Sequence, residues 1–395
     1  AETELRVRPD LASAAELNLG PINAVALGYL ATDMAPAMGW DEKDMMTRWF
    51  DRGESPVLDG IVYTNWGQIA GITLPYTEHT LYNNQDRVAQ DVVAAMKIAK
   101  RLGAKAVVMT GLLPSATKMG NAVATRLRED EPLLTTGHAT TCAAVLLSIE
   151  RVLEACGRKL ERECIAFVGL GSIGTGVLRA ILACMPHPRE IILSDVYGRV
   201  EQLHKLREEI ISASKFRGTV RVAPSGGNLS PDVYGGSLII GATNVADVLD
   251  VGRLRSGTIV VDDSAPHCFS VAAAIERFEA SADTVFCEGG LLDTPNRIRE
   301  TAYHPVGIRD SDSLAKLIAY LGYDSTSITG CILSGLLSAQ YGFRPIIGNL
   351  VTQDVLDHVA VLHKLGFSGG RLRCNNYLLR PDIVARFRAK FGLGK

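Results

Sequence analysis

The stretch that decides the fold is CIAFVGLGSIGTGVLRAILACMPHPREIILSD, which runs from Cys164 to Asp195. It begins with an apolar run typical of a buried strand, residues 164–168, and continues into three glycines with the spacing G-x-G-x-x-G. An amphipathic helical pattern and a second apolar strand, residues 191–194, complete the stretch. This order predicts a strand, a tight turn and a helix whose N-terminus faces the pyrophosphate of a dinucleotide.

The glycine-rich turn is expected to supply most of the cofactor contacts. In such a turn the first glycine permits the tight bend, the second lets the backbone approach the pyrophosphate, and the third lets the helix pack on the strand. A G-x-G-x-x-G by itself also occurs in ordinary turns, but here the strand, the helix and the second strand are all in place. We therefore expect a dinucleotide to contact Gly169, Gly171, Ser172, Ile173 and Gly174.

An acidic residue ends the second strand. Asp195 lies where a carboxylate accepts hydrogen bonds from the ribose hydroxyls of NAD and repels the 2′-phosphate of NADP. The sequence therefore favours NADH as the cofactor, with NADPH as the alternative because Arg199 follows closely. Asp195 could also simply cap the next helix.

Composition narrows the class of protein. The chain has 395 residues, enough for two or three domains, and its net charge of −2 creates no field that would attract nucleic acid or a membrane surface. No uncharged run reaches the roughly 20 residues of a membrane span. Eight cysteines without paired spacing favour a reducing compartment and argue against disulfides and a structural zinc site. We expect a cytoplasmic α/β protein without a metal.

The pattern along the chain predicts three regions. Residues 1–137 are expected to form an N-terminal α/β substrate domain that begins with an irregular arm. This domain should contain a hairpin of two strands, residues 57–65 and 68–74, with Pro75 ending the second strand. Residues 138–310 should form a doubly wound, Rossmann-type dinucleotide domain, entered through a linking helix over 139–156. The helical region 311–395 is expected to pack back over the cleft.

The tips of the later strands in the dinucleotide domain are further candidate cofactor contacts. Ligands of doubly wound sheets bind beyond the carboxyl ends of the strands. Strands are expected to end at GATN (241–244), DDSAPH (262–267) and CEGG (287–290). The residues that we expect to line the cofactor there are Ala242, Thr243, Gly289 and Gly290.

A redox reaction on an acyl group needs a nucleophile that holds the acyl group, most simply a cysteine. Four cysteines fall in core-patterned elements: Cys142, Cys156, Cys164 and Cys184. Cys374 follows a late glycine-rich loop with nothing nearby that suggests chemistry. Cys268, Cys287 and Cys331 remain. Cys331 is expected near the start of a helix, where the dipole favours the thiolate, although it could equally be a small core residue. His138, His267 and His304 are candidate bases.

Several stretches resemble the long-chain acyl-(acyl-carrier-protein) reductases, which make fatty aldehydes. The resemblance covers roughly residues 22–345 and is strongest across 135–182, where LLTTGHATTCAAVLLSIERVLEAC leads into the glycine-rich turn. It also includes TLPYTEHT, VVMTGLLPS, VFCEGG and ITGCILSGLL. The resemblance implies that an acyl chain passes from a carrier-protein thioester to Cys331 and that the reduced cofactor converts it to an aldehyde.

The resemblance has limits. His138 stands where the family has Asn after TTG, and Asp195 replaces a small residue that precedes Arg in NADPH-binding members. About fifty residues at the end of the chain have no counterpart. We expect Cys331 to act as the nucleophile, with the loop from Thr135 to His138, including Thr136, or nearby backbone N–H groups stabilising the oxyanion.

Two other functions remain open. One is a shikimate-type or amino-acid-type NAD(P) dehydrogenase, in which His138 or a nearby lysine is the acid or base and Cys331 is structural. The other is a nucleotide-binding regulatory protein without turnover. For the thioester reductase, the substrate carrier is an acyl or peptidyl carrier protein or coenzyme A.

Overall fold

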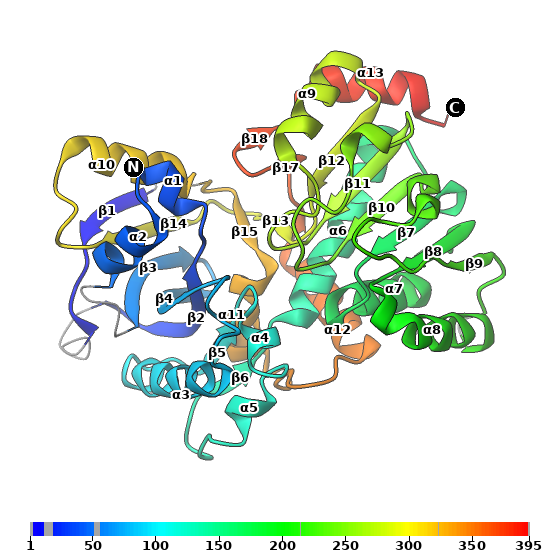
Figure 1. Cartoon of the computed structure of the whole chain (residues 1–395). Coiled ribbons are helices and arrows are strands. Elements are labelled where there is room, and N and C mark those ends of the chain that lie inside the picture. The colour runs from blue at the N-terminus through cyan, green and yellow to red at the C-terminus, as the bar shows by residue number, and fades with distance from the viewer. Residues whose placement is uncertain (1–2, 12–18, 51–55, 214, 323, 394–395) are drawn as a thin grey trace. The chain divides into compact units, whose positions relative to one another are not determined.

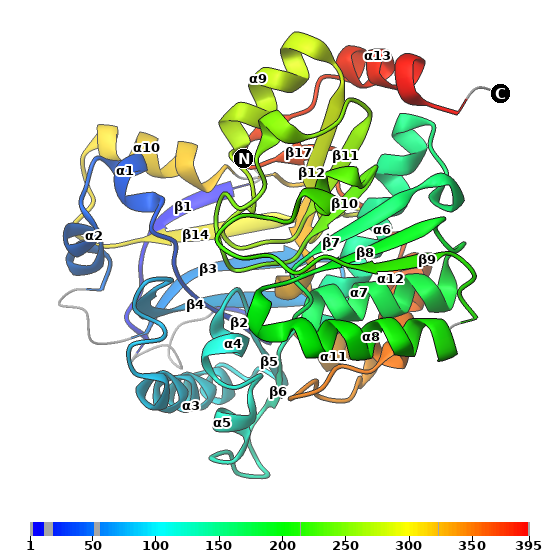
Figure 2. The ribbon, with the colours of Figure 1, turned by 45° about the vertical axis from the view of Figure 1, so that its right-hand side comes forward.

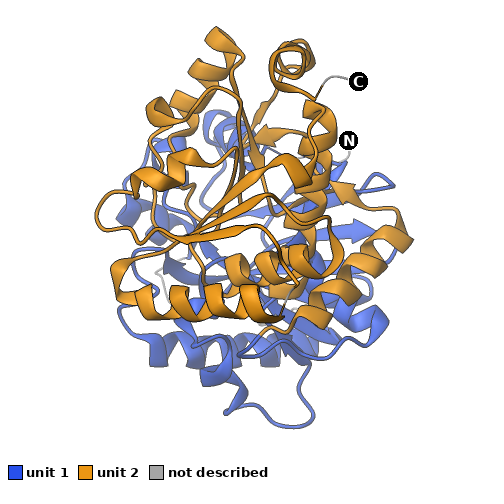
Figure 3. Cartoon of the chain, turned by 90° about the vertical axis from the view of Figure 1, so that its right-hand side faces the viewer, with its two compact units in different colours: residues 1–137, 294–349 blue, residues 138–293, 350–395 orange. Residues whose placement is uncertain are grey.

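The computed structural model describes all residues except 1–2, 12–18, 51–55, 214, 323 and 394–395. It divides into two compact units, coloured in Figure 3: unit 1 contains residues 1–137 and 294–349, and unit 2 contains 138–293 and 350–395. The division after residue 137 coincides with the expected one. Residues 294–349 belong to unit 1 and residues 350–395 to unit 2, so the residues expected to form one helical region, 311–395, are divided between the two units.

Unit 1 is built around a mixed sheet. The strands of unit 1 in the described residues are β1 (Thr3–Val7), β2 (Ile22–Leu30), β3 (Val57–Thr64), β4 (Gly67–Thr77), β5 (Ala106–Met109), β6 (Leu133–Thr135), β14 (Arg299–His304) and β15 (Ser327–Thr329). All of them except β15 belong to this sheet. Its helices are α1 (Met34–Met38), α2 (Glu42–Trp49), α3 (Gln85–Arg101), α4 (Leu113–Ala116), α5 (Asn121–Ala124), α10 (Ser311–Leu321) and α11 (Gly330–Tyr341).

The strand order of this sheet is β1-β14-β3-β4-β2-β5-β6. The strands β4, β2, β5 and β6 run parallel, so their carboxyl ends lie at one edge of the sheet. Helix α3 buries one apolar face, including Val88, Val92 and Met96, in the main core of the unit. Helix α11 packs against β2, β4 and β5. The expected hairpin over residues 57–74 is present as β3 and β4.

Two expectations for unit 1 were wrong. The start of the chain is not wholly irregular, because β1 pairs in parallel with β14, almost three hundred residues away. Strand β4 does not end before Pro75. A shift in register between Tyr29 and Leu30 of β2 accommodates the missing N–H of Pro75 as a bulge, and β4 continues to Thr77.

Unit 2 has the expected doubly wound fold. Its principal strands are β7 (Cys164–Val168), β8 (Glu190–Ser194), β9 (Thr219–Val222), β10 (Leu238–Gly241), β11 (Thr258–Asp262) and β12 (Thr284–Glu288). They form a parallel sheet of order β12-β11-β10-β7-β8-β9. The order reverses at β7, so the carboxyl end of β7 marks the position where such sheets bind ligands.

Helices cover the sheet of unit 2 (Figure 1). They are α6 (His138–Cys156), α7 (Ser172–Cys184), α8 (Val200–Ala213), α9 (Val271–Ser281), α12 (Thr352–Leu365) and α13 (Pro381–Phe391). Figure 2 shows α7 and α8 side by side. Helix α6 contacts α7, α12 and α13 and is buried along most of its length. No helix in the described parts of the chain is long and apolar enough to cross a membrane.

Two short pairs of strands complete the end of unit 2. Strand β13 (Leu291–Asp293) pairs antiparallel with β16 (Ser368–Gly369). A small hairpin is formed by β17 (Arg373–Cys374) and β18 (Tyr377–Leu378), and β17 contacts β12. The late glycine-rich loop therefore leads into a hairpin that packs on the principal sheet of unit 2.

Candidate functional site

The glycine-rich turn has the shape that its sequence predicts. Gly169 has φ +91°, and a Cβ added to it would overlap the carbonyl oxygen of Ala242. A Cβ on Gly174 would overlap the carbonyl oxygen of Gly169. By contrast, a Cβ on Gly171 would have no heavy atom within 4 Å. Packing within the protein explains the first and third glycines, whereas the second borders open space.

The turn also ends in an uncapped helix. Gly171 is the N-cap of α7, and it provides no side-chain hydrogen bond to the amides of the first turn. The first amides of a helix have no partner within that helix, and together with the helix dipole they favour an anion. Ser172 and Ile173 belong to this first turn, beside the open space at Gly171. The arrangement suits a pyrophosphate.

Asp195 braces the turn instead of capping the next helix. One carboxylate oxygen accepts a hydrogen bond from the backbone N–H of Leu170 (2.8 Å), and the other accepts one from the N–H of Val196 (2.7 Å). Arg199 Nη1 lies 3.5 Å from the first oxygen. The remaining lone pairs of Asp195 can accept ribose hydroxyls, while Arg199 stands close enough to attract a phosphate.

The other expected cofactor contacts lie at the same edge of the sheet. Ala242 adjoins Gly169, and the backbone N–H of Thr243 donates to the hydroxyl of Ser264 (3.1 Å). Gly289 and Gly290 follow the end of β12 and pack tightly. A Cβ on Gly290 would overlap a carboxylate oxygen of Asp263. Packing within the protein is therefore enough to explain why residue 290 is a glycine.

His138 contacts the glycine-rich turn. It is the first residue of α6, and its Nδ1 lies 2.9 Å from the hydroxyl of Ser172. Burial lowers its pKa to about 4. The imidazole is therefore neutral at physiological pH and holds a residue of the expected phosphate site.

Thr136 does not have the geometry of an oxyanion donor. Its backbone N–H already donates to the carbonyl of Ile346 (3.0 Å), and the residue is only 1% exposed. The hydroxyl of Thr136 is buried without a hydrogen-bond partner. The expectation that Thr136 stabilises an oxyanion is therefore not supported by its position.

Cys331 differs from the other cysteines in its surroundings. It is the second residue of α11, and its Sγ lies 3.5 Å from the hydroxyl of Thr329, the N-cap residue. Cys331 is half-buried, whereas Cys268 and Cys287 are buried, and burial raises their pKa well above the ordinary value for cysteine. Cys184, which we expected in the core, is exposed at the end of α7.

Sequence reasoning did not identify a tyrosine near Cys331. The hydroxyl of Tyr29 accepts a hydrogen bond from the backbone N–H of Leu112 (3.2 Å). Burial, together with smaller contributions from negative charge on Glu78, Tyr82 and Cys331, raises the pKa of Tyr29 to about 12. Tyr29 precedes the last residue of β2, so a search of the strand ends in unit 1 would have found it.

A second polar cluster lies in unit 2. His267 Nε2 is 3.5 Å from Sγ of Cys374, and Nδ1 is 2.9 Å from a carboxylate oxygen of Asp262. The expectation that nothing near Cys374 suggests chemistry was therefore wrong. The two residues are more than a hundred positions apart, and the β17–β18 hairpin brings them together. His304, the third candidate base, is buried in β14, with Nδ1 3.0 Å from the carbonyl of Pro305.

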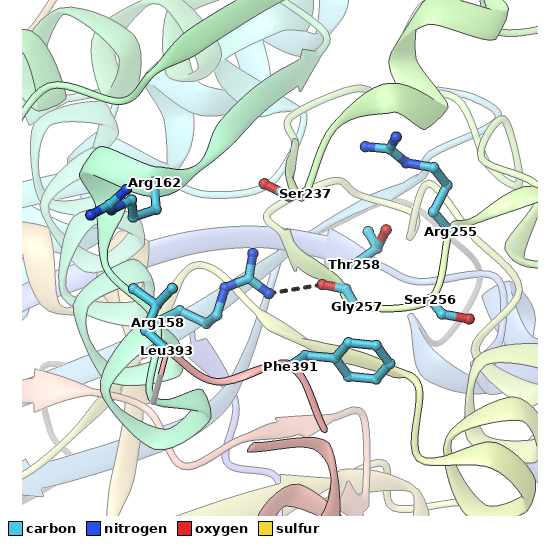
Figure 4. Close-up of a pocket in the computed structure, with 9 residues that line it drawn as sticks. All are labelled: Arg158, Arg162, Ser237, Arg255, Ser256, Gly257, Thr258, Phe391 and Leu393. Carbon is cyan, nitrogen blue, oxygen red and sulfur yellow. Dashed lines mark hydrogen bonds between the residues drawn. The ribbon is translucent and has the colours of Figure 1, made fainter. Parts of the chain in front are cut away.

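A hollow of about 390 Å³ lies at the other edge of the sheet in unit 2, and Figure 4 shows the residues that line it. It lies where β7, β10 and β11 begin. Arg158 reaches across it and donates to the carbonyl of Gly257 (3.1 Å), while pairing with the buried carboxylate of Glu163. Because doubly wound sheets bind ligands at the carboxyl ends of their strands, this hollow is not the expected cofactor site. Its lining is Arg158, Arg162, Ser237, Arg255, Ser256, Gly257, Thr258, Phe391 and Leu393.

No family model and no curated protein matches the sequence. Among solved structures, the chain is similar to L-tryptophan dehydrogenase from Nostoc punctiforme, with 12% identity, a TM-score of 0.37 and coverage of 94% of this chain and 88% of the other. It is also similar to quinate dehydrogenase from Corynebacterium glutamicum in complex with NAD, with 15% identity, a TM-score of 0.33 and coverage of 67% of this chain and 86% of the other. An Ael1 enzyme from Pseudomonas putida has 11% identity and a TM-score of 0.36, with coverage of 89% of this chain and 100% of the other. At these TM-scores the likeness carries no argument about activity or substrate.

Proposed function

We propose that the protein is a nicotinamide-dependent oxidoreductase whose unit 2 binds the dinucleotide. The observation that carries this proposal is the turn at Gly171, which is open where a pyrophosphate would lie and is braced by Asp195. Both features follow the dinucleotide motif. The bound nicotinamide would supply or accept a hydride.

The more specific proposal is reduction of an acyl thioester to an aldehyde, with Cys331 as the nucleophile. It is supported by the half-buried position of Cys331 at the start of α11 and by the resemblance to acyl-(acyl-carrier-protein) reductases. The Cys331 thiolate attacks the acyl carbonyl, the bond to the carrier sulfur breaks, and the carrier leaves as a thiol. The acyl carbon of the enzyme thioester then accepts a hydride, and collapse of the hemithioacetal releases the aldehyde and the Cys331 thiol. The overall reaction consumes one NAD(P)H and one proton.

Tyr29 is our candidate for stabilising the oxyanion of this reaction, because charge on Cys331 is among the influences on its hydroxyl. Its pKa of about 12 means that the hydroxyl keeps its proton at neutral pH and can donate it. One oxyanion donor in known enzymes contributes about 3 kcal/mol to the transition state. This assigns to Tyr29 the role that sequence reasoning gave to Thr136.

An acyl or peptidyl carrier protein or coenzyme A would present the thioester. These carriers share a reactive thioester, and the proposal requires only that this group reach Cys331. Neither the net charge of −2 nor the composition suggests a nucleic-acid partner.

The competing function is a dehydrogenase of shikimate or amino-acid type. It needs an acid or base beside the hydroxyl, ketone or amine that reacts. His138 is poorly placed for that role, because its pKa is about 4 and it is hydrogen-bonded to Ser172. Lys118, in the loop after α4, is exposed to solvent. A regulatory nucleotide-binding protein would bind the cofactor without turnover.

The test is oxidation of NADH and NADPH with a panel of substrates. Acyl-coenzyme A and acyl-carrier-protein thioesters are compared with shikimate, quinate, amino acids and 2-keto acids, and the aldehyde is trapped and identified. We expect turnover with thioesters alone. Turnover with a polar alcohol, ketone or amino acid would establish the dehydrogenase, and cofactor binding with none of these substrates would favour the regulatory protein.

A further inference from the structure

Three side chains with different donor atoms meet in unit 2. The donor atoms of His267, Glu288 and Cys374 all lie within 4.8 Å of one another. His267 comes from the loop after β11, Glu288 ends β12, and Cys374 lies on β17. In the part of the chain that the structure describes, this is the one group of His, Cys, Asp and Glu side chains with such spacing.

The distances in this group suit a metal ion. Zinc bonds to thiolate at about 2.3 Å and to imidazole at about 2.0 Å, so a tetrahedral ion places sulfur and nitrogen about 3.5 Å apart. Sγ of Cys374 and Nε2 of His267 are 3.5 Å apart. Thiolate, imidazole and carboxylate are the three ligand types that zinc uses in proteins.

The surroundings of the group orient each ligand. Asp262, which is fully buried at its side chain, lies 2.9 Å from Nδ1 of His267 and leaves Nε2 directed at Cys374. Such a carboxylate behind a histidine is typical of metal sites, where it fixes the tautomer and the ring. One oxygen of Glu288 accepts the backbone N–H of Asn375 at 2.6 Å. The side-chain oxygen of Asn375 is 3.1 Å from Nε2 and is the nearest candidate for a fourth ligand.

Charge favours a cation at this position. The carboxylates of Asp262, Asp263 and Glu288 gather at one edge of the sheet, and burial, followed by negative charge on Asp262 and Glu288, raises the pKa of Asp263. Arg373 approaches the second oxygen of Glu288 at 3.7 Å and offsets part of this charge. A divalent cation would balance the remainder.

A catalytic Cys-His-Asp triad is the other function for these residues, because Cys374, His267 and Asp262 follow one another in the required order. A nucleophile must be reached by its substrate, however. Cys374 is 0% exposed, whereas Cys331 is half-buried. A buried thiol beside an imidazole and a carboxylate fits a ligand better than a nucleophile.

We propose that His267, Glu288 and Cys374 bind one zinc ion, with Asp262 as the positioning residue of His267. The ion joins the β17–β18 hairpin to the ends of β11 and β12. This inference is independent of the proposed function, because none of the three ligands is assigned a role in hydride transfer or acyl transfer.

The test uses the full chain, purified without a metal-affinity tag, stripped with a chelator and titrated with Co²⁺. We expect one equivalent to bind with an intense thiolate-to-cobalt charge-transfer band, and Zn²⁺ to displace it. Cys374→Ser should abolish the band. Cys287→Ser is the matched control, since Cys287 is also buried and precedes Glu288 on β12, but is outside the ligand set, and it should keep the band. Asp262→Asn should weaken Zn²⁺ binding by about 10- to 100-fold.

A second measurement on the unaltered protein covers the case in which Cys374→Ser does not fold. Alkylation of Cys374, followed by peptide mapping, should be at least tenfold slower with Zn²⁺ bound than after chelation. A wild-type protein that shows no charge-transfer band, or a Cys374 thiol whose alkylation rate is the same with and without Zn²⁺, would overturn the proposal. Acylation of Cys374 by a thioester would overturn it in favour of the triad.

Discussion

At the scale of single residues, two glycines of one turn are required for different reasons. Gly174 has no space for a side chain, because its Cβ would overlap the carbonyl oxygen of Gly169. Gly171 has space, because nothing in the protein lies within 4 Å of its Cβ position. The motif predicts that both positions are glycine, but only the structure separates the packing requirement from the ligand requirement.

This difference predicts opposite effects for two substitutions. Gly171→Val should leave the thermal unfolding temperature nearly unchanged and lower cofactor affinity at least 100-fold, because the side chain occupies the space of the pyrophosphate. Gly174→Ala should instead destabilise the protein by about 1–3 kcal/mol through overpacking. Unfolding scans and titration with the reduced cofactor measure both. Unchanged affinity in a folded Gly171→Val protein would show that the turn is not the phosphate site.

Asp195 gives the second prediction at this scale. We expect NADH to be preferred over NADPH, because the carboxylate repels a 2′-phosphate. Asp195→Asn keeps an oxygen that can accept the N–H of Leu170 but removes the charge. The substitution should narrow the preference, measured as the ratio of kcat/KM values, about tenfold, which corresponds to about 1.4 kcal/mol. A clear preference for NADPH in the unmodified protein would contradict the expectation and indicate that Arg199 binds the 2′-phosphate of NADPH.

At the scale of elements, α6 connects the parts of unit 2. Its sequence predicts a long apolar helix from residue 139 to 156, and the structure has it from His138 to Cys156. The sequence could not predict its partners. Ser148 donates to the carbonyl of Gly289, and the hydroxyl of Thr140 lies 2.8 Å from Nδ1 of His358 on α12. Such contacts depend on residues far away in the chain, which local patterns do not encode.

The contact between α6 and α12 makes unit 2 sensitive to acid. Burial lowers the pKa of His358 to about 4 from the ordinary 6.5. As the pH falls below 6.5, His358 becomes protonated in the unfolded chain, whereas in the folded chain it becomes protonated only near pH 4. The contribution of this group to the free energy of unfolding is therefore complete above pH 6.5 and is lost as the pH falls. Relative to His358→Gln, the unmodified protein should lose about 2 kcal/mol between pH 7 and pH 5. Urea unfolding at the two pH values measures this loss, and equal losses in both proteins would refute it.

At the scale of the whole molecule, the sequence predicts unit 2 better than unit 1. The alternation of strands and helices after residue 164 predicts the parallel sheet, because each connection is local. Unit 1 contains β14, which pairs with β1 and β3, and its C-terminal part includes α11 with Cys331. Segments that return from a distant part of the chain leave no periodic signal where they pair. For the same reason, sequence analysis did not find the group of His267, Glu288 and Cys374.

A buried carboxyl group of unit 1 is expected to respond to pH in the direction opposite to His358. Burial raises the pKa of Glu300, on β14 of unit 1, to about 7 from the ordinary 4.5. The folded protein binds the proton of Glu300 more tightly than the unfolded chain does. The free energy of unfolding therefore falls as the pH rises from 4.5 to 7, whereas the effect of His358 is a fall as the pH decreases. Glu300→Gln should stabilise the protein at pH 8 by up to about 3 kcal/mol and have little effect at pH 4.5. Urea unfolding across this range measures the difference, and a stabilisation independent of pH would show that the Glu300 carboxyl is not the cause.

The central claim, that Cys331 holds an acyl group which is then reduced, is tested by the intact mass of the protein after mixing with an acyl thioester and no cofactor. We predict that one acyl mass appears, maps to the peptide that contains Cys331 and disappears as aldehyde when NADH is added. Cys331→Ser should bind the cofactor normally and neither become acylated nor turn over, while Cys268→Ser and Cys287→Ser should behave like the unmodified protein. An acyl group on Cys287 would preserve the reaction and move the nucleophile. A protein that shows no acylation of any cysteine, together with an active Cys331→Ser variant, would contradict the thioester mechanism itself.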